Sequence, residues 1–317
     1  MADLPIIKPE QLGGIHVNGE TISGLCLLKD VQRSVTKTNK TFYNGVITSG
    51  RDVAIKIWDN SPAFGVIASN PTLAGEIVYI YGTWNEYQGT YSIIVETIRD
   101  VEVDIDPITF YESRYDAKAY WEGLKQLIST NITENAMKIA NAVLFENEEV
   151  SNVFKEAFAA KSHHDNCRNG LLAHTYKLVY NASIVAQLYK GIVDKDLLML
   201  GCLLHDVGKI REMKMGVYQP CAKVTHRFLG VELLDKKMIC DLYDEDWYYE
   251  LVAILLQHHG EWGDPCKTVA SRVVNLIDEY EAKLMLIKQA IDDSDNCGKI
   301  NVDGNYLTYI PKPESDH

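Results

Sequence analysis

The sequence predicts a multidomain protein in which a small all-β barrel precedes an all-α helical bundle. Up to about residue 104, apolar and polar residues alternate in short runs separated by turn signals, which is the pattern of strands. From Ala119 onward the apolar period lengthens to that of amphipathic helices. Seven of the 9 histidines then lie between residues 163 and 259, where one helix follows another.

Composition places the chain among soluble globular proteins. Its 317 residues can form two domains, and 46% of them are hydrophobic and 24% charged. We find no run of about 18 apolar residues and no basic-then-apolar signal region, so neither a membrane span nor secretion is expected. The 7 cysteines are scattered without a Cys-x-x-Cys motif. We therefore expect a cytoplasmic protein with reduced thiols and no disulfide framework.

The acidic net charge of −13 excludes a protein that coats nucleic acid by bulk electrostatics. It does not exclude a nuclease, because carboxylates that hold divalent metals are neutralised once the metals bind.

Five strands are predicted in the first 104 residues, with a short helix between the third and fourth strands. The strands are expected at residues 21–28, 41–48, 53–58, 77–82 and 91–96, and the helix within 62–74. Five strands with one insert at this place are typical of a small Greek-key barrel of the OB type.

Barrels of this type bind single strands with stacked aromatic side chains and a basic groove. The candidates are Lys29, Arg33, Lys37, Lys40, Trp58, Trp84 and Tyr87. Trp84 and Tyr87 flank a predicted turn, so we favour them for stacking on bases. The alternative is that the aromatic side chains fill the barrel and the lysines line a solvated loop, and the sequence of this domain leaves both open.

The helical part is predicted over residues 119–295, after a linker at 105–118 that contains Pro107. Helices are expected at 119–128, up to 145 from a cap at Asn131 or Thr133, and near 148–160, 170–190, 194–206, 225–238, 246–258 and 265–292. The tail, residues 296–317, is polar and is expected to form an extended strap or to be partly disordered.

The segment Leu203–Lys209 joins an apolar run to His205 and Asp206, a side-by-side imidazole and carboxylate that can ligate metal. Gly208 allows close backbone approach, and Lys209 offers a cation for a phosphate. The candidate ligands His174, His205, His226, His258 and Asp278 follow one another along the chain. The number of residues between successive ones is about the length of one helix plus a connection. Each candidate ligand is therefore expected from a different helix of a bundle.

Six motifs in order resemble the HD-domain 3′→5′ exoribonucleases of the YhaM type. They are Ala159–His164, Asn169–Thr175, Leu204–Lys209, Thr225–His226, Gln257–Gly260 and Ile277–Asp278. The resemblance spans roughly residues 13 to 292 and includes the barrel. Asn169–Gly170 stands where the family usually has two glycines, and Thr225 where a glycine normally precedes the histidine. These departures concern substrate preference more than metal binding.

The resemblance implies a ligand set of His174, His205, Asp206 and Asp278. It adds His226 and one of His258 or His259 as ligands of a second metal, with Asp206 as the bridge. It also implies hydrolysis of single-stranded RNA from the 3′ end to 5′-mononucleotides, with DNA as a further substrate. Two divalent ions, with manganese foremost, are what the resemblance implies. The mixed nitrogen and oxygen ligands by themselves suit Mn, Fe, Co, Ni or Zn more than Mg.

Asp206 and Lys209 are the expected catalytic residues at the metals, with Lys209 stabilising charge on the phosphate. His163, His164 and Arg168 lie just before the first ligand and are candidates to contact substrate or to protonate the leaving oxygen.

Two other functions fit the same residues. The first is an HD phosphohydrolase acting on a small or cyclic nucleotide, since one metal pair serves both reactions. The second is a non-catalytic single-strand-binding module with a degenerate metal domain. A homo-oligomer is compatible with either.

Overall fold

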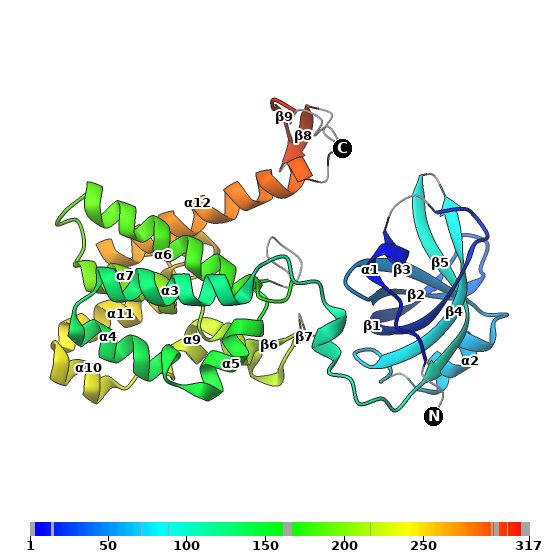
Figure 1. The fold of residues 1–317 in the computed structure, drawn as a ribbon, viewed down its shortest axis with the longest axis horizontal. Helices are drawn as coiled ribbons and strands as arrows, with labels where there is room; N and C mark the ends of the chain where they lie inside the picture. Colours follow the sequence, from blue (N-terminus) through cyan, green and yellow to red (C-terminus); the bar gives the residue numbers. More distant parts are fainter. Residues whose placement is uncertain are drawn as a thin grey trace. The chain divides into compact units, whose positions relative to one another are not determined.

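The computed structural model of the chain describes residues 4–13, 16–70, 72–87, 89–160, 167–215, 217–292, 294, 298–302 and 304–311. The chain divides into two compact units, Met1–Ser113 and Arg114–His317. The first is built from strands and the second is mainly helical (Figure 1). The predicted fold class, an OB-like barrel followed by an all-α bundle, is confirmed.

The first unit is a closed five-stranded barrel in which the strands follow the order β1-β2-β3-β5-β4. Neighbouring strands are antiparallel except β3 and β5, which are parallel. The strands are β1 (Thr21–Val35), β2 (Thr41–Thr48), β3 (Asp52–Trp58), β4 (Ile77–Tyr87) and β5 (Thr90–Asp100).

Alternation of side chains along the strands creates the barrel core. In β3, Val53, Ile55 and Ile57 are buried, whereas Ala54 is exposed and Lys56 is half-buried. This period of two places every second residue inside the barrel. β1 is longer than predicted because its first half pairs with β4 and its second half with β2, and the pairing with β2 shifts register between Leu28 and Asp30. One long strand with an irregularity thus helps to close the barrel.

Short elements complete the barrel. The predicted insert is α2 (Pro62–Ser69), whose Ala63 and Ile67 are buried in the core of the barrel. At the N-terminal end lies α1 (Pro9–Leu12). After β5, the 3₁₀ turn η1 (Pro107–Phe110) buries Phe110, and the amide of Gly50 donates to its carbonyl at 2.7 Å. This part of the predicted linker therefore packs on the barrel.

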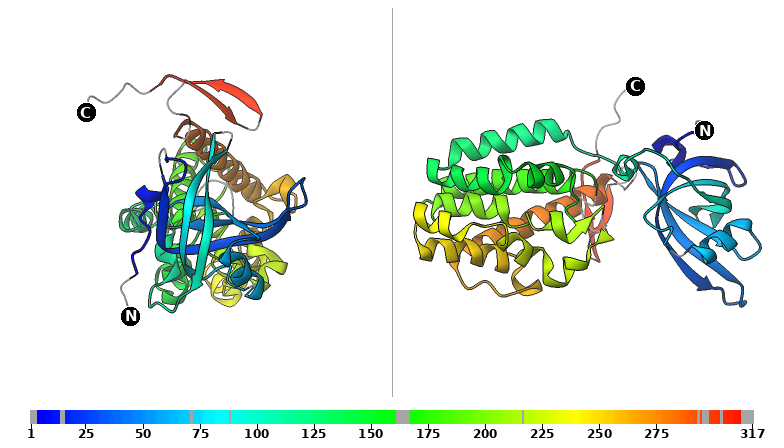
Figure 2. Two further views of the ribbon diagram at one scale, coloured as in Figure 1. Left: turned by 90° about the vertical axis from the view of Figure 1, so that its right-hand side faces the viewer. Right: turned by 90° about the horizontal axis from the view of Figure 1, so that it is seen from below.

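The second unit is a bundle of helices with two short hairpins (Figure 2). Its helices are α3 (Ala117–Asn131), α4 (Glu134–Ala140), the π-turn η2 (Asn141–Phe145), α5 (Glu148–Glu156), α6 (Gly170–Leu188), α7 (Lys195–Leu204), α8 (Lys209–Glu212), η3 (Pro220–Val224), α9 (Thr225–Val231), α10 (Lys236–Leu242), α11 (Glu245–Gln257), η4 (Gly260–Trp262) and α12 (Val269–Asp292). Its hairpins are β6 (Met213–Lys214) with β7 (Val217–Tyr218), and β8 (Lys299–Val302) with β9 (Asn305–Thr308).

Helix α7 lies at the centre of this bundle. It contacts α3, α4, α6, α11 and α12, and its residues from Asp196 to Leu204 are all buried. A helix that is apolar on every side is stable only inside a core. The C-terminal end of α7 consequently lies inside the bundle, so His205 and Asp206, which follow it directly, are buried there.

Local signals explain where two helices begin. Thr133, not Asn131, caps α4, because its hydroxyl accepts a hydrogen bond from the amide of Ala136. The single helix predicted at 225–238 is wrong, since the structure has α9 and α10 there. Asp235 accepts from the amide of Met238 and starts a new helix, so the side chain supplies a cap where the apolar pattern continues.

The polar tail contains more structure than predicted. After α12 the chain forms the hairpin β8–β9, which extends from the end of that helix (Figure 1). Among the described residues, no helix is both long enough and apolar enough to cross a bilayer.

Candidate metal centre

Five helical segments bring the predicted ligands to one place. His205 and Asp206 follow the end of α7, and the others come from α6, α9, the end of α11 and α12. These residues are His174, His205, Asp206, His226, His258, His259 and Asp278. Each segment is held by apolar residues next to its ligand, such as Leu204, Val207 and Ile277, which are buried in the core of the bundle. Packing of these apolar residues in the core thus fixes the positions of the polar ligand side chains.

The first group of ligand atoms, called site A here, consists of His174, His205 and Asp206. The two imidazole Nε2 atoms are 3.3 Å apart, and Nε2 of His205 is 3.2 Å from Asp206 Oδ2. Asp278 adjoins site A, with its Oδ1 3.2 Å from Nε2 of His174. All four residues implied by the resemblance therefore lie in one cluster.

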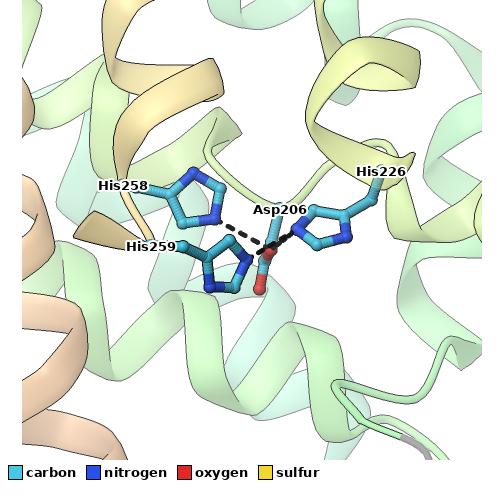
Figure 3. Close-up of side chains that lie close together, drawn as sticks. All are labelled: Asp206, His226, His258 and His259. Atoms are coloured by element: carbon cyan, nitrogen blue, oxygen red, sulfur yellow. Dashed lines mark hydrogen bonds and ion pairs between the residues drawn. The ribbon is translucent and has the colours of Figure 1, made fainter. Parts of the chain in front are cut away.

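The second group, called site B, consists of Asp206, His226, His258 and His259 (Figure 3). Nε2 of His226 is 3.3 Å from Asp206 Oδ1 and 3.0 Å from Nε2 of His259. Nε2 of His258 is 3.6 Å from the same carboxylate oxygen. Asp206 therefore directs Oδ2 toward site A and Oδ1 toward site B. Both His258 and His259 point into site B, whereas the sequence left one of them to be chosen.

Two of the histidines are oriented by backbone carbonyls. Nδ1 of His205 lies 2.9 Å from the carbonyl of Cys202, and Nδ1 of His258 lies 3.0 Å from that of Leu255. In both cases the acceptor is three residues earlier in the chain. The hydrogen bond places the proton on Nδ1 and leaves the Nε2 lone pair facing the cluster.

Two others are oriented by carboxylates that sequence reasoning missed. Glu281 Oε2 is 2.7 Å from Nδ1 of His174, and Glu212 Oε2 is 2.8 Å from Nδ1 of His226. Both glutamates are buried. A weak signal existed for Glu281, because it follows Asp278 by three residues and so shares its helix face. No comparable signal existed for Glu212, whose partner lies in another element.

The arrangement fits divalent cations. In the part of the chain that the structure describes, Asp206 Oδ1 and His258 Nε2 are buried and have no hydrogen-bond partner. In each group one ligand atom per residue lies within 4.8 Å of all the others. Buried acceptors aimed at one point are costly unless a donor or cation satisfies them. Imidazole nitrogen and carboxylate oxygen are the donors that first-row divalent ions use, so these residues can hold such ions.

The pKa values of His258 and His259 in site B and of His174 in site A are shifted in opposite directions. Burial and the neighbouring His258 lower the pKa of His259 to about 3, and burial lowers that of His258. Both are therefore neutral at pH 7, the form that ligates metal. Burial also lowers the pKa of His174, but hydrogen bonds to Asp278 and Glu281 outweigh it and raise the pKa to about 10. Binding of a metal by His174 must therefore release a proton.

Lys209 lies beside the shared carboxylate. Its Nζ is 2.6 Å from Asp206 Oδ2 and donates to the carbonyl of Ala159 at 2.6 Å. Burial raises the pKa of Asp206, but Lys209 and His205 reverse the effect and hold it well below its usual range. The carboxylate is thus ionised and ready to bridge. The contact of Lys209 with a phosphate, expected from the sequence, stays a prediction.

Gly208 permits the contact that joins the two ligand-bearing segments. A Cβ added at this position would lie 2.0 Å from the carbonyl oxygen of His226 and 2.5 Å from the amide nitrogen of Gly230. The close backbone approach expected from the sequence is confirmed.

Gly208→Ala should therefore destabilise the protein by about 1–3 kcal/mol and displace His226, because backbone atoms cannot yield as a side chain can. Thermal unfolding together with metal titration measures both effects. The matched control is Gly230→Ala on the other side of this contact, where the new Cβ would be 3.4 Å or more from its neighbours. In the helix this control should change stability by less than about 1 kcal/mol. Equal stability of the two variants would contradict the prediction.

The remaining candidates of the helical unit are His163, His164 and Arg168. His163 and His164 lie outside the described residues. Arg168 precedes α6, and its guanidinium pairs with the carboxylate of Glu156. Its expected contact with substrate is therefore in competition with this ion pair.

In the barrel, the preference for Trp84 as a stacking residue is wrong. Its side chain is 3% exposed and belongs to the core of the barrel, where it stacks on His16 with ring centroids 3.5 Å apart. Trp84 alternates with outward residues on β4 and faces inward, so no base can reach its ring. Tyr87 is 64% exposed at the end of the same strand. Trp58 is half-buried and contacts Phe42.

The four basic candidates of the first hairpin differ in environment. Lys29 forms an ion pair with Asp52 at 2.7 Å. Arg33, Lys37 and Lys40 are exposed. All four remain candidates for contact with phosphates.

Comparison with known proteins agrees with the fold and the ligand cluster. Residues 171–283 match the HD domain family, so the helical unit carries an HD domain around the clustered histidines and aspartates. Three curated relatives are each named 3′-5′ exoribonuclease YhaM. The protein of Shouchella clausii is 25% identical over 291 residues, which cover 87% of this chain and 88% of the relative.

The relatives from Bacillus velezensis and Bacillus subtilis are both 26% identical, over 299 and 293 residues. Each alignment covers 88% of this chain and 90% of the relative. The resemblance to YhaM-type proteins, inferred from the motifs, is thereby confirmed over both units. Among solved structures, a replication protein A heterotrimer bound to ssDNA has a chain that matches 33% of this one, and 74% of itself, at 16% identity and a TM-score of 0.21. That similarity is too low to bear on fold or function.

Proposed function

We propose that the protein is a metal-dependent 3′→5′ exonuclease that hydrolyses single-stranded RNA to 5′-mononucleotides. The observation that supports this best is the placement of Asp206 between two groups of histidines, with one carboxylate oxygen toward each. One carboxylate shared by two metal sites is the arrangement of two-metal phosphodiesterases. Relatives that align over most of the chain carry the name 3′-5′ exoribonuclease.

Two divalent ions are proposed, one in site A with Asp278 as a further ligand and one in site B. When bound, such ions supply a metal-activated hydroxide and charge stabilisation at the phosphate. Manganese is the proposed ion, because the mixed imidazole and carboxylate ligands suit Mn²⁺ better than Mg²⁺.

The residues of the chain have distinct proposed roles. Asp206 holds the two sites together, and its ionised state is maintained by the cation of Lys209. Lys209 can exchange this carboxylate for a phosphate oxygen and stabilise the charge that develops there. Its carbonyl partner, Ala159, keeps the ammonium group at the edge of the cluster.

The barrel is proposed to bind the single strand on the outer face of β2 and β3. Phe42 and Trp58 are cross-strand partners there, and their ring centroids are 5.0 Å apart. Lys56, two residues before Trp58 and thus on the same face, lies 6.0 Å from the ring centre of Tyr87. Partly exposed rings next to a lysine form the combination that stacks bases and binds the backbone of single strands.

Replacing Trp58 or Phe42 by alanine should weaken binding of a single-stranded RNA by about 1–3 kcal/mol per ring. Fluorescence anisotropy with labelled RNA and chelator present measures affinity without hydrolysis. Tyr81→Ala is the matched control, because Tyr81 is an exposed ring of the barrel whose cross-strand partners are Ser23 on β1 and Thr97 on β5. Equal losses in all three variants would place the strand elsewhere.

A single incubation tests the activity. Pure protein with Mn²⁺ and a 5′-labelled single-stranded RNA should produce a ladder that shortens from the 3′ end, and free 5′-mononucleotides. The same assay with DNA gives the sugar preference. Intact oligomers alongside rapid hydrolysis of free or cyclic nucleotides would instead identify a small-nucleotide phosphohydrolase.

A further inference from the structure

Two buried carboxylates stand directly behind the proposed metal ligands. Glu281 is 3% exposed and Glu212 is 7% exposed. Charged side chains are almost never buried to this degree without a partner, because loss of water disfavours the ion. Each carboxylate must therefore have a partner that stabilises its charge. Neither glutamate belongs to the two groups of candidate ligand atoms.

Glu281 lies on α12 between a histidine and a lysine. One carboxylate oxygen is 2.7 Å from Nδ1 of His174, and the other is 2.9 Å from Nζ of Lys177. His174 and Lys177 are three residues apart on α6 and so share one face of that helix. The lysine compensates the buried charge, and the carboxylate can then serve the histidine.

Glu212 ends α8 and binds one residue twice. Its Oε2 is 2.8 Å from Nδ1 of His226, and its Oε1 accepts from the amide of the same residue at 2.9 Å. The pair of contacts fixes both the ring and the start of α9. The orientation of His226 is thus set from a different element than the one that carries it.

Sites A and B share the same pattern of hydrogen-bond acceptors for the Nδ1 atoms of their histidines. Site A contains one histidine held by a carboxylate and one held by a backbone carbonyl, and site B contains the same combination. A carboxylate that accepts the Nδ1 proton fixes the tautomer, restricts rotation of the ring and increases the basicity of Nε2. A carbonyl fixes the tautomer with less effect on basicity, because it carries no net charge.

We infer that Glu281 and Glu212 are positioning residues, the first for His174 of site A and the second for His226 of site B. The inference rests on the proposed function, because the sites concerned are the proposed metal sites. Each glutamate acts on one site only, so their loss should weaken the two sites separately. Lys177 supports site A through Glu281.

Titration of metal-free protein with Co²⁺, followed by visible absorption and by calorimetry, tests this without any substrate. Wild-type protein should bind two ions. Glu281→Ala should weaken one of them about 10–100-fold and leave the other unchanged, and Glu212→Ala should weaken the other ion by a similar factor. Glu281→Gln, whose amide oxygen can still accept from Nδ1, should recover most of the affinity lost in Glu281→Ala.

Glu279→Gln is the control, since Glu279 is exposed on the same helix and pairs with Lys283. It should bind both ions as the wild type does. Glu281 and Lys177 also line a cavity of about 360 Å³ between α6 and α12, so water can enter where the alanine variant loses its carboxylate. Circular dichroism of each variant establishes that the helices are retained.

A double-mutant cycle separates positioning from general support of the fold. In a His174→Ala background, Glu281→Ala should have no further effect on Co²⁺ affinity, because no imidazole remains to be oriented. An undiminished effect in that background, or equal weakening of both ions by Glu281→Ala alone, would overturn the inference. Wild-type protein that binds no Co²⁺ would overturn the proposed function itself, whereas normal wild-type binding with unaffected glutamate variants would overturn the inference alone.

Discussion

Asp206→Ala is expected to reduce hydrolysis of single-stranded RNA by about 10⁴-fold or more while RNA still binds to the barrel. The reason is that each carboxylate oxygen faces a different site. Oδ2 is 3.2 Å from Nε2 of His205 in site A, and Oδ1 is 3.3 Å from Nε2 of His226 in site B. Removing one side chain therefore removes a ligand from both sites at once. Single-turnover hydrolysis and anisotropy on the same RNA measure the two properties.

The substitution also leaves the cation of Lys209 buried without its carboxylate, so some loss of stability is expected. Asp196→Asn controls for that loss. Asp196 is buried ten residues earlier, at the start of α7, where it binds Thr133 and Tyr243. This variant should lose stability yet retain hydrolysis. Activity of Asp206→Ala within about tenfold of the wild type would rule out Asp206 as the bridge.

Removal of bound metal should abolish hydrolysis completely, and addition of Mn²⁺ should restore it. The helices should remain folded, because the ligands are carried by segments whose neighbours, such as Leu204 and Ile254, are fully buried in the core. This differs from small zinc domains, which unfold without their metal. Stability should nevertheless rise on metal binding, by about 2.7 kcal/mol when the free ion is at 100 times its dissociation constant.

Dialysis against a chelator, followed by circular dichroism, thermal unfolding and RNA hydrolysis with each of Mn²⁺, Co²⁺, Zn²⁺ and Mg²⁺, provides the measurement. The expected order of recovered activity places Mn²⁺ above Mg²⁺, because imidazole ligands suit Mn²⁺ better. Full activity in protein shown by elemental analysis to be metal-free would contradict the proposed chemistry.

The strands and most helices could be predicted because their signals are local. Alternation in β3 and the long apolar stretch of α7 follow directly from which side chains must be buried. Failures arose where a second local signal competed with periodicity. Asp235 starts a new helix inside a continuous apolar pattern, and Trp84 looks like a turn residue although the alternation of β4 turns it inward.

The ligand residues could be named from the sequence, but their partners could not. His174, His205 and Asp206 stand out by residue type, spacing and resemblance to known motifs. Glu212 and Glu281 are ordinary glutamates in a chain with 44 acidic residues, and only the folded chain places them against His226 and His174. Apart from the three-residue spacing between Asp278 and Glu281, their local sequence gives no signal that they are buried.

The sequence by itself determined the order of the two units, the periodic elements and the set of imidazole and carboxylate groups available for metal. The tertiary structure alone decided which atoms meet: that Asp206 faces both groups, that His258 and His259 both enter site B, and that two buried glutamates stand behind the ligands. The physical reason is that periodicity and residue type act over a few neighbouring residues, whereas the direction of a side chain is set by packing between helices distant in the chain.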